Sequence, residues 1–146
     1  MAEQSDPRSR PRRLPGQRQT RQRSTIYEVI RTAAGPLTVP EIHQRAQREV
    51  GGIGIATVYR TINLLQDEGL VQAVILPSGE TRYELANLGH HHHFSCRSCE
   101  EVFDLPACPV EIPRNDVVEG GFVVESHELT LYGVCPACVE TPAASS

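Results

Sequence analysis

Residues 56–85, ATVYRTINLLQDEGLVQAVILPSGETRYEL, decide the fold of the first half of this chain. Apolar side chains recur at helical spacing in its first part: Val58, Ile62 and Leu65. This periodicity predicts a helix over residues 56–68, and Gly69 is a natural residue to end it. Two strand-like runs follow, at residues 70–76 and 81–85, and they flank a turn at residues 77–80. The stretch therefore predicts one helix followed by a β-hairpin.

Two further helices are predicted upstream of this stretch. Apolar residues share one side of the segment Thr20–Ala34, and a Gly-Pro pair follows as its stop. Thr38 and Glu41 have the spacing of a capping box, which opens a second helix that runs to about Glu49. Three helices followed by a hairpin is the order of a winged helix-turn-helix domain. In such a domain the third helix reads DNA and the hairpin forms the wing.

The predicted third helix carries polar side chains that can reach phosphates and base edges. They are Thr57, Tyr59, Arg60, Thr61 and Asn63. Residues 1–86 hold 12 arginines and 9 acidic side chains, whereas residues 87–146 hold 2 arginines and 9 acidic side chains. Basic residues at Arg23 and in a disordered arm, residues 1–17, can neutralise phosphates. Double-stranded DNA is the predicted partner; the alternative is a small helical domain whose polar face contacts only solvent.

Metal-ligand residues dominate the second half of the chain. Two Cys-x-x-Cys pairs occur, Cys96 with Cys99 and Cys135 with Cys138. Two thiolate pairs are what a closed tetrahedral zinc site needs, so we predict a structural Zn(II) site. A pair of redox thiols or a disulfide is the alternative. Since the sequence shows no sign of export, metal ligands are favoured over disulfides.

Four consecutive histidines, residues 90–93, precede the first cysteine pair. They lead into a predicted strand, where successive side chains point to opposite faces. His91 and His93 therefore face one way, and His90 and His92 the other. One strand can in this way serve two separate, more exchangeable metal sites.

The remainder of the second half is predicted to be rich in strands, with one short helix within residues 106–118. The strands are residues 94–96, 101–105 and a long run over 122–134. Cys108 has no partner at ligand spacing, so it is predicted to be a free thiol. This half is small, so both a bound structural zinc ion and a partner subunit would help to stabilise its core.

Taken together, these residues resemble the ferric uptake regulator family of bacterial metalloregulators over about residues 18–138. The resemblance implies an α+β fold, with an N-terminal winged helix-turn-helix domain followed by a small α/β dimerisation domain. The implied parts are a DNA-binding domain (18–85), a hinge (86–89), a metal-binding dimerisation domain (90–140) and a tail (141–146). It further implies a homodimer that represses transcription when metal is bound. The motifs that carry it are Thr20-Arg-Gln-Arg23, Gly54-Ile-Ala-Thr-Val-Tyr-Arg60, Tyr83-Glu84-Leu85, His90–Cys99, Ser126-His127 and Leu131–Cys138.

The same resemblance implies two regulatory metal sites. One would comprise Glu84, His91, His93 and Asp104, and the other His90, His92, Glu111 and His127. Two positions depart from common family patterns, since Pro36 and Ala86 stand where many members have a histidine or a cysteine ligand. His43 is predicted to be a packed or surface histidine, whereas Gln72 is a candidate weak ligand. Nitrogen and oxygen donors suit Zn(II), Fe(II) and Mn(II) alike, so the regulatory metal stays open among the three.

The leading functional prediction is a cytoplasmic, metal-dependent transcriptional repressor that controls metal-ion uptake through zinc or iron. A peroxide-sensing or manganese-sensing regulator on the same scaffold is the alternative, and a zinc-bound interaction module without DNA binding is more distant. An enzyme is not expected, because no His-Glu-x-x-His or comparable catalytic motif occurs. No run of about 18 apolar residues occurs, so no membrane partner is expected.

Overall fold

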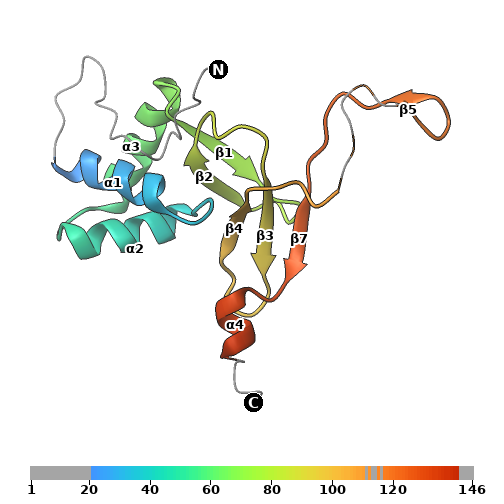
Figure 1. Cartoon of the computed structure of the whole chain (residues 1–146). Coiled ribbons are helices and arrows are strands. Elements are labelled where there is room, and N and C mark those ends of the chain that lie inside the picture. Colours follow the sequence, from blue (N-terminus) through green and yellow to red (C-terminus); the bar gives the residue numbers. More distant parts are fainter. Residues whose placement is uncertain (1–20, 111, 113–114, 116, 142–146) are drawn as a thin grey trace, which may run out of the picture. The chain divides into compact units, whose positions relative to one another are not determined.

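The computed structural model describes residues 21–110, 112, 115 and 117–141, and it divides into two compact units between Gly89 and His90 (Figure 1). The fold is α+β, as the sequence predicts. The predicted arm, residues 1–17, lies outside the described residues, as do Glu111 and residues 142–146 of the tail. The residues of the predicted hinge include two with positive φ, Asn87 at 63° and Gly89 at 78°.

Three helices open the N-terminal unit: α1 Arg21–Thr32, α2 Val39–Glu49 and α3 Ile55–Asp67. They agree with the predicted helices to within about two residues at each end. Their apolar sides pack into one core, whose fully buried members include Ile26, Ile42, Val58 and Leu65. The helical spacing of these apolar residues is thus explained by burial, which is the main source of helix stability in a folded domain.

Local signals determine where α2 begins and where α3 ends. Thr38 Oγ1 accepts a hydrogen bond from the Glu41 amide at 3.3 Å, and Glu41 Oε2 accepts one from the Thr38 amide at 2.8 Å. This reciprocal pair is the predicted capping box. After α3, Gly69 adopts φ 71°, a left-handed conformation that glycine takes without steric cost.

A β-hairpin completes the N-terminal unit, with β1 Val71–Ile75 and β2 Thr81–Leu85 paired antiparallel. Gln72 lies opposite Glu84 in this register. The outer edge of β2 is also paired, because Leu37 and Tyr83 exchange two backbone hydrogen bonds of 3.0 and 2.8 Å. The hairpin is therefore joined to the segment that precedes α2.

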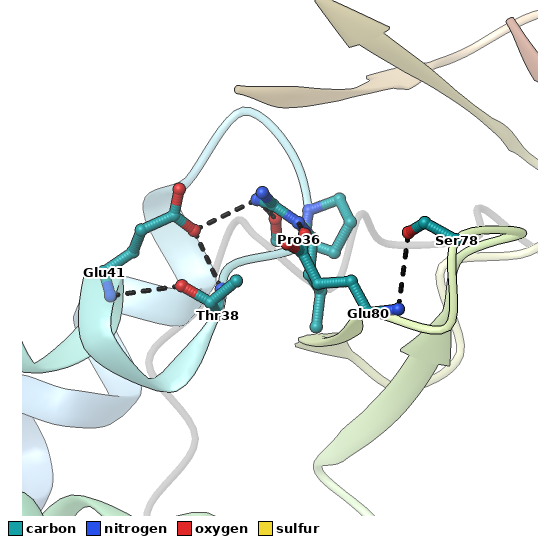
Figure 2. Close-up of polar contacts among 6 residues, drawn as sticks. Pro36, Thr38, Glu41, Ser78 and Glu80 are labelled. Atoms are coloured by element: carbon teal, nitrogen blue, oxygen red, sulfur yellow. Dashed lines mark hydrogen bonds and ion pairs between the residues drawn. The ribbon is translucent and has the colours of Figure 1, made fainter. Parts of the chain in front are cut away.

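Arg82, a buried arginine in β2, reinforces this connection. Its partners Pro36, Glu41 and Glu80 are labelled in Figure 2. Its Nη1 donates to Glu41 Oε2 at 3.0 Å and to the Pro36 carbonyl at 3.2 Å. Its Nε forms an ion pair with Glu80. Because Glu41 also accepts the Thr38 amide in the capping box, one carboxylate serves both the N-terminus of α2 and the wing.

Replacing Arg82 with methionine is expected to lower the free energy of unfolding of this unit by about 2 to 4 kcal/mol, since it leaves partly buried carboxylates without their cation. Urea denaturation followed by circular dichroism measures the change. Arg31→Met is the matched control, because Arg31 pairs with Glu28 three residues away within the same helix, α1. Equal stability of the two variants would contradict the role assigned to Arg82.

The C-terminal unit is built on a three-stranded sheet with the order β4-β3-β7. Its strands are β3 His92–Cys96, β4 Val102–Leu105 and β7 Thr130–Gly133. β4 runs antiparallel to β3, whereas β7 runs parallel to it. A short hairpin, β5 Val117–Val118 with β6 Phe122–Val123, and a terminal helix, α4 Pro136–Glu140, complete the unit (Figure 1).

Two expectations for this unit were wrong, and one element was missed. The predicted long strand over residues 122–134 is two short strands, β6 and β7, with irregular chain between them. No helix occurs among the described residues of the segment 106–118, which instead contains β5. Helix α4 was not predicted, because five residues are too few to display helical periodicity.

The described residues of the C-terminal unit form almost no apolar core. Among its described residues, the buried apolar side chains are Cys96, Val102 and Cys135. The unit must therefore obtain its stability from another source, such as a metal or a partner subunit. In the part of the chain that the structure describes, no helix has the length and hydrophobicity needed to cross a bilayer.

Candidate metal centres

The four cysteines of the two Cys-x-x-Cys pairs converge, with their sulfur atoms within 4.8 Å of one another. Cys96 ends β3, and the turn that follows it brings Cys99 back toward it. This turn is closed by hydrogen bonds from the Cys96 amide to the Glu101 carbonyl at 2.9 Å and from the Glu100 amide to the Cys96 carbonyl at 3.0 Å. Glu100 adopts φ 64° to complete it.

The second pair lies at the start of α4. Cys135 is the N-terminal capping residue of α4, and the Cys138 amide donates to the Cys135 carbonyl at 3.0 Å. The two pairs are linked directly, since the Cys135 amide donates to Cys96 Sγ at 3.3 Å and the sulfurs of Cys99 and Cys135 are 3.9 Å apart. Two tight turns far apart in the sequence thus present four sulfurs to one point.

The electrostatics of the four-cysteine group fit a divalent cation. Hydrogen bonds from the backbone amides of Cys99 and Cys135 lower the pKa of Cys96 to about 6. The Glu101 amide favours the Cys99 thiolate, but burial and the neighbouring sulfurs outweigh it and raise the pKa of Cys99 to about 12. One sulfur is therefore ready to ionise, whereas others resist because negative charges would be crowded together. A soft divalent cation such as zinc removes this repulsion, so the donor set fits the metal.

A second group lies on the sheet beside β3. The Asp104 carboxylate oxygen Oδ1 is 3.5 Å from His93 Nε2 and 3.8 Å from His91 Nε2. His93 and Asp104 are directly opposed in the β3–β4 pairing, and the rings of His91 and His93 are 5.0 Å apart. The structure thus brings together three of the four residues named for the first regulatory site, all within the C-terminal unit.

Glu84, the fourth residue of that set, belongs to the N-terminal unit. Its carboxylate accepts a hydrogen bond from Gln72 Nε2 at 3.0 Å across the β1–β2 hairpin. Gln72 therefore orients Glu84 in addition to being a candidate ligand. Participation of Glu84 in the site stays a prediction.

A third group forms around His92, on the opposite face of β3. His92 Nε2 lies 3.1 Å from His127 Nε2, and the rings of His90 and His127 are 4.8 Å apart. The structure therefore brings together His90, His92 and His127 of the second predicted site. Burial and the neighbouring imidazoles lower the pKa of His92, which favours the neutral form that binds metals.

Cys108 was missed as a member of this third group. Its sulfur lies 3.2 Å from His92 Nε2 and 3.4 Å from His127 Nε2. Cys108 is a free thiol, as predicted, but its proximity to the histidines was not expected from the spacing of residues along the chain. His92 and His127 lie 16 and 19 residues from Cys108 along the chain, so no short motif marks the contact. The only hint in the sequence was that Cys108 belongs to neither Cys-x-x-Cys pair.

The residues proposed to contact DNA lie on the N-terminal unit. On α3, Tyr59 and Arg60 are exposed, Thr57 is half-buried, and Arg60 donates to Thr57 Oγ1 at 3.3 Å. Arg23 is half-buried on α1. Thr61, which was expected to be exposed, is instead 2% exposed and belongs to the packed side of α3.

His43 has a structural explanation, as predicted. Its Nε2 lies 2.6 Å from the Ile53 carbonyl, so the side chain connects α2 to the loop before α3. A hydrogen bond to a backbone carbonyl satisfies a polar group in the loop, and this is an ordinary role for a half-buried histidine.

Comparisons with known proteins agree with this arrangement. The model of the ferric uptake regulator family matches residues 15–132. The chain is 32% identical to the ferric uptake regulation protein of Campylobacter jejuni over 130 residues, which cover 86% of this chain and 82% of that protein. It is 34% identical to the zinc uptake regulation protein of Mycobacterium tuberculosis over 124 residues, covering 84% and 95% respectively.

The fold also resembles that of a solved zinc-bound manganese uptake regulator. The TM-score is 0.69 at 29% sequence identity, and the match covers 82% of this chain and 92% of that protein. The names of these three proteins refer to iron, zinc and manganese in turn. Similarity of about 30% therefore identifies the kind of regulator without selecting the metal.

Proposed function

Because the chain belongs to the ferric uptake regulator family, we propose that it is a metal-dependent repressor that binds operator DNA as a homodimer and controls metal-ion uptake, with zinc or iron as the sensed metal. Members of this family are metal-responsive transcription regulators and not enzymes. The observation that carries the proposal is the combination, in one chain, of a polar helix α3 on a winged unit with three groups of metal-ligand side chains.

The chemistry of α3 supports DNA binding. Tyr59, Arg60 and Asn63 are exposed on a helix whose other side is anchored in the core through Val58 and Ile62. Arginine offers a planar set of donors that can bind a guanine edge or a phosphate with two hydrogen bonds. The paired and anchored hairpin is suited to the role of a wing beside such a helix.

A homodimer is supported by the exposed apolar residues of the β5–β6 hairpin. Its apolar side chains are 42% to 70% exposed: Val117, Val118, Phe122 and Val123. An isolated two-stranded hairpin is marginally stable in water, and contiguous exposed apolar residues mark association surfaces. A second copy of the chain would cover these side chains and would also supply a second α3 for a symmetric operator.

The proposed switch involves residues on both sides of the hinge. We assign Glu84 to one metal site with His91, His93 and Asp104, and the tightly held Zn(II) to the four-cysteine group. Only six residues separate Glu84 from His91 along the chain, so the connector keeps them within reach of one another. A metal ion held by both units would limit the rotation of the hinge. Nitrogen and oxygen donors at this site accept zinc, iron or manganese.

Replacing Arg60 with alanine tests the DNA-binding role. Operator affinity is expected to fall by about 10- to 100-fold, because one contact to a base edge or phosphate is worth about 1 to 3 kcal/mol. Metal content and molar mass should not change, since Arg60 lies outside all three metal-ligand groups. Arg48→Ala on α2 is the control for loss of an exposed positive charge.

Fluorescence anisotropy with DNA from upstream of the chain's own gene, at several salt and metal concentrations, measures these affinities. Unchanged affinity and salt dependence in Arg60→Ala would show that α3 does not read the operator. Absence of any metal-dependent DNA binding in the unmodified protein would instead favour a zinc-bound interaction module.

A further inference from the structure

We propose that Cys108 supplies a thiolate ligand to the group formed by His90, His92 and His127, and that this set of one thiolate and three imidazoles takes zinc. The inference deepens the proposed function and rests on it, in that the histidine group is taken to be a metal site. It differs from the ligand set that the family resemblance implies, in which the fourth ligand is the carboxylate of Glu111.

The positions of the donor atoms carry the inference. His92 Nε2, His127 Nε2 and Cys108 Sγ form a triangle whose edges are 3.1, 3.2 and 3.4 Å. Metal–ligand lengths of about 2.0 Å for nitrogen and 2.3 Å for sulfur place neighbouring donors around one zinc about 3.3 to 3.6 Å apart. Each edge agrees with this range to within about 0.4 Å. His90 completes the set, since the ligand atoms of all four residues lie within 4.8 Å of one another.

The surroundings of Cys108 suit a metal ligand. Its Sγ also donates a hydrogen bond to the Val110 carbonyl, and loss of the thiol proton on metal binding would break this bond. Cys108 lies between Pro106 and Pro109, and the following proline restricts its backbone to extended conformations. The short loop that presents the sulfur is therefore stiff. Cys108 and His127 are half-buried and His90 is exposed, so an ion can enter from solvent and leave again. By contrast, two of the four cysteines of the structural group are fully buried.

A sulfur donor changes which metal the group prefers. Three imidazoles with a carboxylate bind Fe(II), Mn(II) and Zn(II), and they select among these ions little beyond the Irving–Williams order of affinities. Three imidazoles with a thiolate form a softer set, which favours Zn(II) over Mn(II) and Fe(II). This face of β3 would then respond to zinc, whereas the His91, His93 and Asp104 face keeps only nitrogen and oxygen donors.

Alkylation of the full-length protein tests the thiolate ligand directly. The protein is treated with a mild chelator that leaves the four-cysteine zinc in place, reacted with iodoacetamide with or without added zinc, and analysed by mass spectrometry. One cysteine, Cys108, is expected to be alkylated without added zinc and to be protected when zinc binds. Titration with Co(II) should produce a sulfur-to-cobalt charge-transfer absorption that Cys108→Ser lacks.

Affinity measurements with matched variants complete the test. Competition with a chromophoric chelator is expected to show that Cys108→Ser weakens zinc binding at this group by at least tenfold, and Glu111→Gln by less. His92→Ala removes a ligand of this group, so the zinc that this variant fails to bind is the zinc that belongs to the group. If that zinc binds while Cys108 is alkylated at an undiminished rate, the inference is overturned and the proposed function stands. If the unmodified protein binds DNA equally with and without metal, the proposed function fails, whereas the protection of Cys108 is still measured.

Discussion

Replacing Cys96 or Cys138 with serine is expected to remove one tightly held zinc per chain, to unfold the C-terminal unit and to abolish the dimer. The described part of this unit buries only Cys96, Val102 and Cys135 among its apolar side chains. Structural zinc supplies about 10 to 16 kcal/mol in zinc-finger peptides, which is comparable to the whole stability of an ordinary domain. With so small a core among its described residues, the unit depends on this free energy together with what a partner subunit supplies.

Zinc content by mass spectrometry, thermal unfolding by circular dichroism and molar mass by light scattering measure the effect. Cys108→Ser is the matched control, because Cys108 lies outside the four-cysteine group and its loss should leave the tightly held zinc in place. A Cys96 or Cys138 variant that lacks this zinc and still forms a well-folded dimer would rule out a structural role for the site.

Replacing Glu84 or His91 with alanine is expected to preserve the tightly held zinc and to abolish the metal-dependent gain in operator affinity, a loss of about 10- to 100-fold. Glu84 is the next-to-last residue of β2 in the wing, and His91 directly precedes β3 beyond the hinge. If the two residues share one ion, either replacement frees the hinge. The arrangement that binds the operator then becomes a minor population.

Metal titrations of operator binding for four variants provide the test. His90→Ala and His127→Ala are the comparison pair, since these residues belong to the group on the opposite face of β3 and should alter the response more mildly. If the His90 and His127 variants lose the metal response while the Glu84 and His91 variants keep it, the switch lies on the other face.

Most of the N-terminal unit could be predicted from the sequence, because its signals are local. Helical spacing at Val58, Ile62 and Leu65 reports the buried side of α3, and the pairing of Thr38 with Glu41 starts α2. Each signal spans fewer than ten residues, so it can be recognised without knowledge of the rest of the chain. The C-terminal unit was predicted less well, since short strands and a five-residue helix leave weak local patterns.

The sequence by itself determined the kinds of metal ligand and their division between two faces. Two Cys-x-x-Cys pairs indicate a four-sulfur site, and alternation along β3 separates His92 from His93. Only the tertiary structure decided which distant residues complete each group. Parallel pairing of β7 with β3 is a long-range contact, and the proximity of His127 and Cys108 to His92 is another. No local pattern encodes such contacts, because they depend on how the whole unit packs. Cys108 therefore became a candidate ligand only in the folded chain.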